Sequence, residues 1–234
     1  MRSDILVLIP ARGGSKGIPG KNIKPFLGKP LIYYTLDIAS QFFNPEQIVV
    51  STDDLKIKET VESYGIAVPF VRPGEISGDT ASSNMVILHA LEFFKTQGRT
   101  FKYTLLLQPT SPYRDAVHIQ ALLDILERNA HFEMILSVKE TGSNPYFVLY
   151  EEEDGLLQRS KKSSFTRRQD CPKVWEANGS LYLFNNELLA QKGDIYLLDK
   201  KKLVMEDPLL SIDLDTPTDW KIAELLLKDV VSSR

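Results

Sequence analysis

The chain has 234 residues, of which 43% are hydrophobic and 25% are charged, a composition that suits one well-buried domain. Its net charge of -3 argues against a nucleic-acid-binding protein, which usually carries a basic surplus. The single Cys171 excludes an intramolecular disulfide and a cysteine-based zinc site. Because no signal peptide or membrane span precedes the first apolar run, we expect a cytoplasmic protein with no membrane or nucleic-acid partner.

Short apolar runs alternate along the chain with segments whose apolar residues recur at three- and four-residue spacing, the pattern of parallel βαβ units. The predicted strands are residues 5–9, 47–51, 68–71, 103–107, 134–138, 180–184 and 210–214, and the predicted helices are residues 30–40, 55–64, 82–94, 117–128 and 217–230. Thr80 or Asp79 is the expected cap of the third helix, and Thr216 with Asp219 is the start signal of the last one. These elements predict an α/β fold with a mostly parallel sheet and helices on both faces.

The alternation breaks between residues 139 and 177. Residues 144–150 there predict a strand, residues 151–155 a turn, and residues 158–173 are basic and polar. No internal repeat and no linker rich in glycine and serine divides the chain. We therefore interpret residues 139–177 as an insertion within a single domain, residues 1–234.

Residues 10–25, PARGGSKGIPGKNIKP, follow directly on the first predicted strand. In an open α/β sheet, ligands bind beyond the carboxyl ends of the strands. Glycines bring backbone N–H groups close to phosphate oxygens, Ser15 adds a hydroxyl donor, and the cations oppose a polyanion. The spacing matches neither the Walker A loop nor the dinucleotide fingerprint. Composition alone predicts a triphosphate-binding loop or, alternatively, a flexible solvated one. The four cations are Arg12, Lys16, Lys21 and Lys24.

Two aspartates lie two positions apart in the predicted strand at residues 210–214 and just after it. In a strand, Asp213 and Asp215 point to the same face, about 6–7 Å apart. Such carboxylates repel each other unless a cation lies nearby, and Mg²⁺ prefers oxygen ligands. The pattern is equally that of one aspartate capping the following helix while the other is solvated.

Gln108 lies where an apolar strand ends, because Pro109 and Pro112 cannot continue it. A neutral side chain that can donate and accept hydrogen bonds suits a polyol substrate at this edge of a sheet. An amide that stabilises the turn explains the same residue equally well.

The loop at residues 10–22 resembles, nearly letter for letter, the signature of the acylneuraminate cytidylyltransferases, the sugar cytidylyltransferases that make CMP-activated nonulosonic acids from CTP. Residues 212–220, IDLDTPTDW, and residues 108–112, QPTSP, resemble the same family. The related enzymes that activate Kdo carry an acidic Q-G-D type sequence at the position of Gln108. Further matches at residues 72–83, 167–170 and 176–180 extend the resemblance over residues 5–226.

This resemblance implies a Rossmann-like nucleotidyltransferase fold with a small dimerisation insertion. It implies transfer of CMP from CTP to the anomeric hydroxyl of a nine-carbon sugar acid, with Mg²⁺ as the cofactor and release of pyrophosphate. The implied partner is a second copy of the chain, so that each site of the homodimer is shared.

The resemblance also assigns roles to individual residues. Nucleotide-binding positions are Ala11, Arg12, Gly13, Ser15, Lys16, Lys21, Asn22, Arg72, Ala81 and Ser83. Sugar-acid-binding positions are Gln108 and Asn178, together with Arg167, Arg168 and Gln169, which would reach the neighbouring subunit's substrate. Asp213 and Asp215 become the metal-binding and catalytic acids, and Arg12 and Lys21 the catalytic cations that neutralise the leaving pyrophosphate.

The residues themselves leave several alternatives open. The substrate could be legionaminate, pseudaminate, Kdo or a sugar phosphate, and the nucleotide base follows only from the resemblance. A noncatalytic nucleotide-binding module is a second alternative, against which the presence of both Asp213 and Asp215 argues. Without the resemblance, Arg167 and Arg168 would be assigned to a solvated loop.

Overall fold

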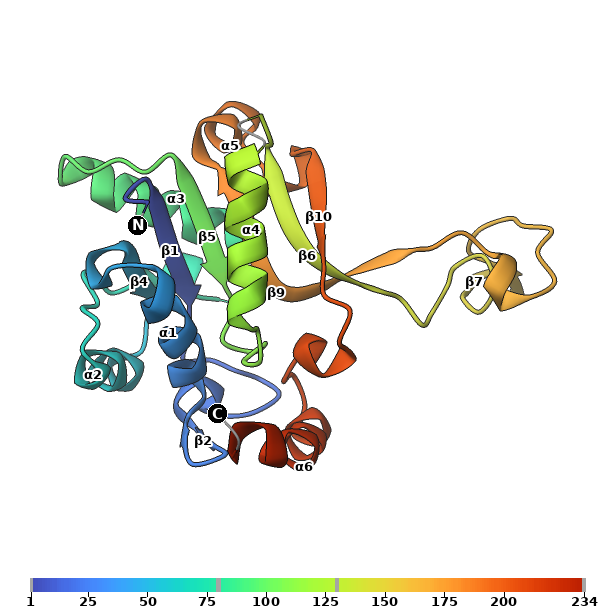
Figure 1. The fold of residues 1–234 in the computed structure, drawn as a ribbon, viewed down its shortest axis with the longest axis horizontal. Coiled ribbons are helices and arrows are strands. Elements are labelled where there is room, and N and C mark those ends of the chain that lie inside the picture. The colour runs from blue at the N-terminus through green and yellow to red at the C-terminus, as the bar shows by residue number, and fades with distance from the viewer. Residues whose placement is uncertain (1, 79–80, 129–130, 233–234) are drawn as a thin grey trace.

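A computed structural model describes residues 2–78, 81–128 and 131–232. Its centre is a six-stranded sheet in the order β10-β6-β9-β5-β1-β4 (Figure 1). All ladders of this sheet are parallel except the two that β9 forms with β5 and β6, which confirms the predicted, mostly parallel sheet. The strands are β1 (Ile5–Pro10), β4 (Ile48–Ser51), β5 (Tyr103–Leu107), β6 (Met134–Glu140), β9 (Trp175–Asn185) and β10 (Lys200–Val204).

Helices cover both faces of the sheet, because alternate residues of the buried strands point to opposite sides. Ile5, Val7 and Ile9 of β1 pack with helices α1, α2 and α4, whereas Leu6 and Leu8 pack with α3 and α5. The expected α/β fold class is therefore confirmed. The helices are α1 (Leu31–Phe42), α2 (Leu55–Tyr64), α3 (Ser83–Thr96), α4 (Ala116–Arg128), α5 (Asn186–Lys192) and α6 (Pro217–Ser232).

The helix starts follow local capping chemistry. The backbone N–H of Asp219 donates to the Thr216 hydroxyl, and the Asp219 carboxylate accepts from the Thr216 N–H and hydroxyl, which is the capping box predicted for α6. Helix α3 is capped by Ser82, whose hydroxyl accepts from Met85 N–H. The caps predicted at positions 79 and 80 lie outside the described residues.

Two strands predicted outside the insertion are wrong. Residues 68–71 form no strand, because Pro69 in their middle lacks the donor that a ladder requires. Residues 210–214 also form none: the chain first makes a 3₁₀ helix, Pro208–Ser211, whose start is capped by the Asp207 carboxylate. Proline at a first helical position and an aspartate before it favour a helical turn over a strand.

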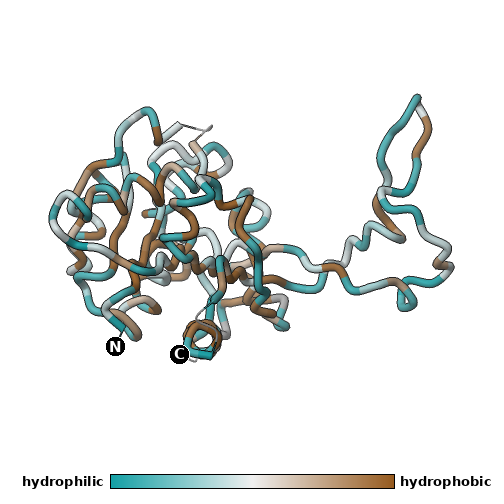
Figure 2. The backbone as a smooth tube through the Cα atoms, turned by 90° about the horizontal axis from the view of Figure 1, so that it is seen from above, coloured by the Kyte–Doolittle hydropathy of each residue, from teal (hydrophilic) through white to brown (hydrophobic). Residues whose placement is uncertain are grey.

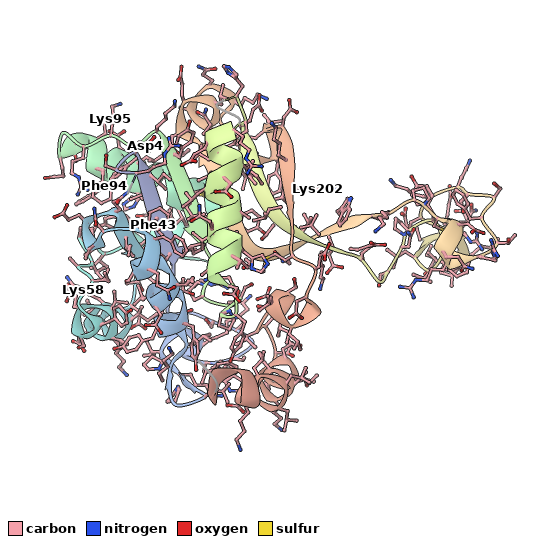
Figure 3. The ribbon with its side chains drawn as sticks, in the orientation of Figure 1. Asp4, Phe43, Lys58, Phe94, Lys95 and Lys202 are labelled. Atoms are coloured by element: carbon pink, nitrogen blue, oxygen red, sulfur yellow. The ribbon has the colours of Figure 1, made fainter. Side chains whose placement is uncertain are left out.

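One strand of the main sheet was not predicted. Strand β10 lies at the sheet edge and begins with three consecutive lysines, Lys200–Lys202, a pattern that indicates an exposed face rather than a strand. Charged residues are common on edge strands because they block pairing with another chain. The Lys202 ammonium stands 3.7 Å from the centre of the Trp175 ring of β9 (Figure 3). The short strands β2 (Pro25–Phe26) and β3 (Lys29–Pro30), and helix α5, were also missed.

The predicted insertion projects from the main sheet as an arm, which we define as residues 141–174 (Figures 1 and 2). Strands β6 and β9 remain paired at the base of the arm as far as Glu140 and Trp175. The outer hairpin joins β7 (Tyr150–Glu153) and β8 (Leu156–Arg159). The strand predicted at residues 144–150 is wrong except at Tyr150, because Asn144 instead caps a turn through its bond from Tyr146 N–H. The turn predicted at residues 151–155 is shorter than expected and occupies only residues 154–155, because β7 extends to Glu153.

Helix α6 packs against the glycine-rich loop through a separate apolar cluster. Phe26 is fully buried at the centre of this cluster and meets the rings of Tyr34, Tyr113 and Trp220 at 4.9–5.9 Å between ring centroids. Leu214 belongs to the same cluster. The cluster therefore holds the segment of Asp213 and Asp215 beside the loop, although nearly 200 residues of chain separate them.

Candidate active site

A pocket of about 480 Å³ lies beyond the carboxyl end of β1. It is formed by the glycine-rich loop, by the segment before α3, by the end of β5 and by the two aspartates, so residues far apart in sequence meet in one space. Most of the predicted site residues line it. Its lining comprises Pro10, Arg12, Ser15, Lys16, Gly17, Lys21, Asn22, Arg72, Ala81, Ser83, Val86, Leu106, Gln108, Thr110, Asp213 and Asp215.

The loop keeps its shape through bonds to the neighbouring β4 end. Ala11 N–H donates to the Ser51 carbonyl at 2.9 Å, and Gly13 N–H donates to the Asp53 carboxylate at 3.0 Å. A Cβ on Gly13 would lie 2.6 Å from Asp54 Oδ2, so only glycine fits this approach. Ala11 and Gly13, predicted to bind nucleotide, support the pocket from outside its lining.

Lys21 joins the loop to the aspartate segment. Its ammonium donates to the Leu214 carbonyl at 2.7 Å and to Asp215 Oδ1 at 3.1 Å, and the residue is only 8% exposed. A buried cation needs such partners to offset the water that it loses. Gly17, four residues before Lys21 in the loop, lies close to the same segment. A Cβ at Gly17 would lie 2.0 Å from the Asp215 carbonyl oxygen.

The two carboxylates differ in their surroundings. Loss of water inside the pocket raises the pKa of Asp213 above its usual range, and the charge of Asp215 raises it further, against the opposing hydrogen bond from Thr110 and the charge of Lys21. Asp215 is more open, with 69% of its side chain exposed, and pairs with Lys21. Ionised Asp213 is therefore an unfavourable charge that an added cation would stabilise.

Asp213 and Asp215 suit a magnesium ion only where the phosphates of a substrate supply further oxygen ligands. Among residues 2–78, 81–128 and 131–232, no cluster of three or more histidine, cysteine, aspartate or glutamate side chains could hold a metal alone. Mg²⁺ is commonly bound by one or two carboxylates together with substrate phosphates. Asp213 and Asp215 beside a phosphate-binding loop match that donor set.

Arg72, which follows β4 in the chain, also lines the pocket and is 5% exposed. Its guanidinium is 3.5 Å from Asp53, and in the described part of the chain its buried Nε and Nη2 atoms have no hydrogen-bond partner. Buried donors without acceptors are costly. They fit a ligand that brings acceptors into the pocket near Ala81 and Ser83.

A second pocket of about 390 Å³ adjoins the first one, since Ser83, Leu106 and Gln108 line both. Most of its remaining wall is apolar and aromatic. Gln108, predicted to bind the sugar acid, therefore stands at the junction of a cationic pocket and an apolar one. The rest of this lining is Met134, Leu136, Ala177, Tyr182, Phe184, Ile195, Tyr196 and Lys200.

Four of the predicted sugar-acid residues are not brought into these pockets. Asn178 is 5% exposed, and its side chain accepts from the Ser137 hydroxyl and donates to the Ser211 hydroxyl. Arg167, Arg168 and Gln169 are exposed on the arm, where Arg167 pairs with Asp170 and Arg168 donates to the Gly142 carbonyl. Asn178 thus supports the aspartate segment through Ser211.

Sequence reasoning missed several lining residues. Thr110 lies in the QPTSP segment and could have been found from its position two residues after Gln108. Tyr182, Phe184 and Tyr196 carried no signal, because aromatic residues in β9 and after α5 are typical of a core.

The sheet order, with a pocket lined by cations and two carboxylates at the carboxyl edge, is that of the nucleotidyltransferase fold, as similar solved structures show. The solved structure titled CMP:2-keto-3-deoxy-manno-octonic acid synthetase complexed with CTP is similar over 97% of this chain and 100% of that one, with a TM-score of 0.71 and 17% identity. A 4-diphosphocytidyl-2C-methyl-D-erythritol synthase from Anaerococcus prevotii is similar over 96% of this chain and 98% of its own, with a TM-score of 0.62 and 16% identity. Both likenesses confirm the fold.

Residues 6–231 match the family described as cytidylyltransferase, and the chain belongs to that enzyme family. It is 33% identical to post-translational flagellin modification protein B of Campylobacter coli, over 97% of this chain and 96% of that protein. It is 32% identical to a CMP-N,N'-diacetyllegionaminic acid synthase of Legionella pneumophila, over 96% of each chain, and to a pseudaminic acid cytidylyltransferase of Campylobacter jejuni, over 95% of this chain and 96% of that one. The predicted family is confirmed. No helix of the described residues is long and apolar enough to cross a membrane.

The contact of Gly17 with the aspartate segment yields a matched pair of variants. Gly17→Ala places a Cβ against the Asp215 carbonyl and must displace one of the two segments, whereas a Cβ at Gly14 meets nothing within 4 Å. We expect Gly17→Ala to lower turnover by about 100-fold, the order of loss that a misplaced site produces, while Gly14→Ala keeps turnover within about threefold. Steady-state kinetics, with circular dichroism to check folding, measure both. Equal activities would show that Gly17 does not set the position of Asp215.

Proposed function

We propose that this protein transfers CMP from CTP to the anomeric hydroxyl of a nonulosonic acid and releases pyrophosphate. The observation that carries the proposal is the junction at Gln108 of two pockets, one cationic with two carboxylates and one apolar. The first suits a nucleoside triphosphate, and the second suits a sugar that carries acyl or deoxy carbons. The relatives named for legionaminic and pseudaminic acid support this substrate class.

The proposed binding mode follows from the walls of the pockets. The triphosphate lies along the glycine-rich loop, against Arg12, Lys16 and Lys21, and the base and ribose lie toward Arg72, where buried donors need acceptors. The sugar acid enters the second pocket and contacts Gln108. This arrangement directs the anomeric hydroxyl at the α-phosphorus from the side opposite the leaving group.

In the proposed reaction the anomeric oxygen forms a bond to the α-phosphorus as the bond to the bridging oxygen of the β-phosphate breaks. The hydroxyl proton leaves to the solvent or a neighbouring base, and pyrophosphate departs. Arg12 and Lys21 neutralise the charge that develops on the leaving pyrophosphate, and the walls hold both substrates in line. Positioning and charge suffice, so no covalent enzyme intermediate is needed.

We infer that Asp213 and Asp215 hold Mg²⁺ together with the phosphates of CTP. When bound, the ion supplies positive charge at the reacting phosphates. Lys21 keeps Asp215 in place on one side, and the raised pKa of Asp213 reflects a carboxylate that gains from an added cation.

We infer further that the protein works in the cytoplasm as a homodimer in which the arm of one subunit completes the sugar pocket of the other. Arg167, Arg168 and Gln169 are exposed on the arm and absent from the lining of their own subunit's pockets. The outer hairpin exposes Leu156 and Leu157 by 68% and 71%, apolar area that a partner would cover. A two-fold dimer places the same arginine pair at both sites, where it can bind a sugar carboxylate.

The substrate assignment predicts which mixtures release pyrophosphate. Purified protein with Mg²⁺ should release it only when CTP and a free nonulosonic acid are both present, and other nucleoside triphosphates should be poor substitutes. A matrix of the four ribonucleoside triphosphates against N-acetylneuraminic, legionaminic, pseudaminic and Kdo acids measures this directly. Release with sugar 1-phosphates but not with free sugar acids would overturn the assignment.

The raised pKa of Asp213 predicts that the substitution Asp213→Asn has opposite effects on thermal stability and on turnover. Because this carboxyl binds its proton more tightly in the folded than in the unfolded protein, ionisation costs stability as pH rises through the folded pKa. Asp213→Asn should therefore keep or raise Tm at pH 7, with the gain disappearing near pH 3, while turnover falls about 100-fold or more.

Asp215→Asn is the matched control for this prediction. It should lose turnover to a similar degree without the gain in Tm, because Asp215 is exposed and its loss leaves Lys21 without its carboxylate partner. Thermal unfolding and kinetics from pH 3 to pH 8 distinguish the two variants. A lower Tm for Asp213→Asn at pH 7 would contradict the electrostatic account of this residue.

A shared site predicts complementation between two inactive variants. Arg168→Ala removes the arm's contribution and Asp215→Asn disables the pocket, so a mixed dimer keeps one intact site. After dissociation and reassembly, random pairing makes about half of the dimers mixed and restores about a quarter of the wild-type activity. Mixed dimers that are demonstrably present yet inactive would rule out sharing of these two residues.

A further inference from the structure

Arg114 is a fully buried cation beside the candidate site that no part of the preceding mechanism uses. It lies between the QPTSP segment and α4 and is 2% exposed. Its guanidinium donates to three elements: Nη1 to the Thr35 hydroxyl of α1 at 2.9 Å, Nε to the Ser180 hydroxyl of β9 at 3.3 Å, and Nη2 to the Gln108 carbonyl in a short bond. One side chain thus joins a helix, the middle of β9 and the residue that follows β5.

The electrostatics of Arg114 are unusual for a buried arginine. Burial lowers its pKa to about 9, which still leaves it charged at neutral pH. Burial is the cause of this pKa shift, and the three acceptors that hold the guanidinium are neutral oxygens. A charge buried without a counter-ion destabilises a fold. An apolar side chain would fill the same volume without the free-energy cost of burying a charge. This indicates that Arg114 has a role other than stabilising the fold.

The acceptors of Arg114 point to that purpose. Gln108 lines both pockets, and its backbone is fixed where β5 ends by the bond from Arg114. Ser180 follows a bend at Gly179, whose φ is +74° and whose Cβ would lie 3.7 Å from Asp213 Oδ2. The planar guanidinium has several donors at fixed angles, which sets the direction of its acceptors as a lysine ammonium cannot.

We propose that Arg114 is a positioning residue for Gln108, which it fixes at the junction of the two pockets so that the amide meets the sugar acid. Arg114 itself touches no substrate and acts through the Gln108 backbone and through Ser180 in the middle of β9. The proposal rests on the proposed function, because it takes the sugar acid to be the ligand of Gln108. The proposal makes different predictions for the two substrates. Binding of the sugar acid depends on Arg114, whereas binding of CTP, which the loop mainly holds, does not.

Two variants and one control test the proposal. Arg114→Lys keeps the charge but loses the geometry of the guanidinium, and Thr35→Val removes one acceptor with little change in shape. The control is Thr104→Val, at the other end of β5, which removes a buried hydroxyl bond to Asn186 far along the strand from Gln108. All three variants lose a buried hydrogen bond, so their Tm values show what a structural loss alone does.

We expect Arg114→Lys to raise the KM for the sugar acid by about tenfold or more and Thr35→Val by about threefold, the losses that follow from a misplaced binding group. The KM for CTP should stay within about twofold of the wild-type value in both, and Thr104→Val should change neither KM. A parallel rise of both KM values in Arg114→Lys, or a rise in Thr104→Val that matches it at equal loss of Tm, would overturn the proposal.

A second measurement tests the role of Arg114 without relying on the proposed enzyme activity. Hydrogen exchange in peptides that cover residues 105–113 requires no turnover, and it should be faster in Arg114→Lys and unchanged there in Thr104→Val. A wild-type protein that turns over no sugar acid would refute the proposed function, whereas unchanged exchange in Arg114→Lys would refute the fixing of Gln108.

Discussion

The ammonium of Lys21 makes one site out of two distant parts of the chain. It donates to the Leu214 carbonyl and to Asp215 across more than 190 residues of sequence, and it is almost completely buried. A cation in that position is tolerable only while both acceptors are present. The position of Asp215, and through it that of Asp213, therefore depends on the loop, and Gly17 and the cluster around Phe26 enforce the same approach by packing.

Charge is distributed across the site in a way that suits a polyanion and a metal ion. Asp213 is a carboxylate whose ionisation the pocket disfavours. Arg72 pairs with Asp53 at 3.5 Å, but within the described residues two of its buried nitrogens have no hydrogen-bond acceptor. Behind the strand end, Arg114 is a charge held by neutral groups. Each arrangement costs stability in the protein alone. In the proposed function the substrates and the metal ion relieve this cost at Asp213 and Arg72, whereas Arg114 keeps its neutral protein acceptors. In the proposed function the apolar second pocket takes the carbon-rich parts of the acceptor.

Local signals in the sequence predict one half of the site, and long-range contacts determine the other half. The glycine-rich loop after β1 and Gln108 at the end of β5 follow from an apolar run and the residues that stop it. The sequence predicts that Asp213 and Asp215 share a face of a strand, but they lie in irregular chain after a 3₁₀ helix. The bonds from Lys21 to Leu214 and Asp215 hold their segment beside the loop. The role of Arg114 was invisible, because burial of a charge is a property of the folded neighbours. Strand β10 was missed because three consecutive lysines show no alternation.

The coupling between Lys21 and Asp215 is the most direct test of this account. CTP affinity should be measured by calorimetry with Mg²⁺ for the wild type, Lys21→Met, Asp215→Asn and the double variant, a double-mutant cycle. If the two residues hold one site together, each single change weakens CTP binding by about tenfold or more, and the double change weakens it little further than the more severe single one. Losses that multiply in the double variant would show two independent contacts and contradict the account.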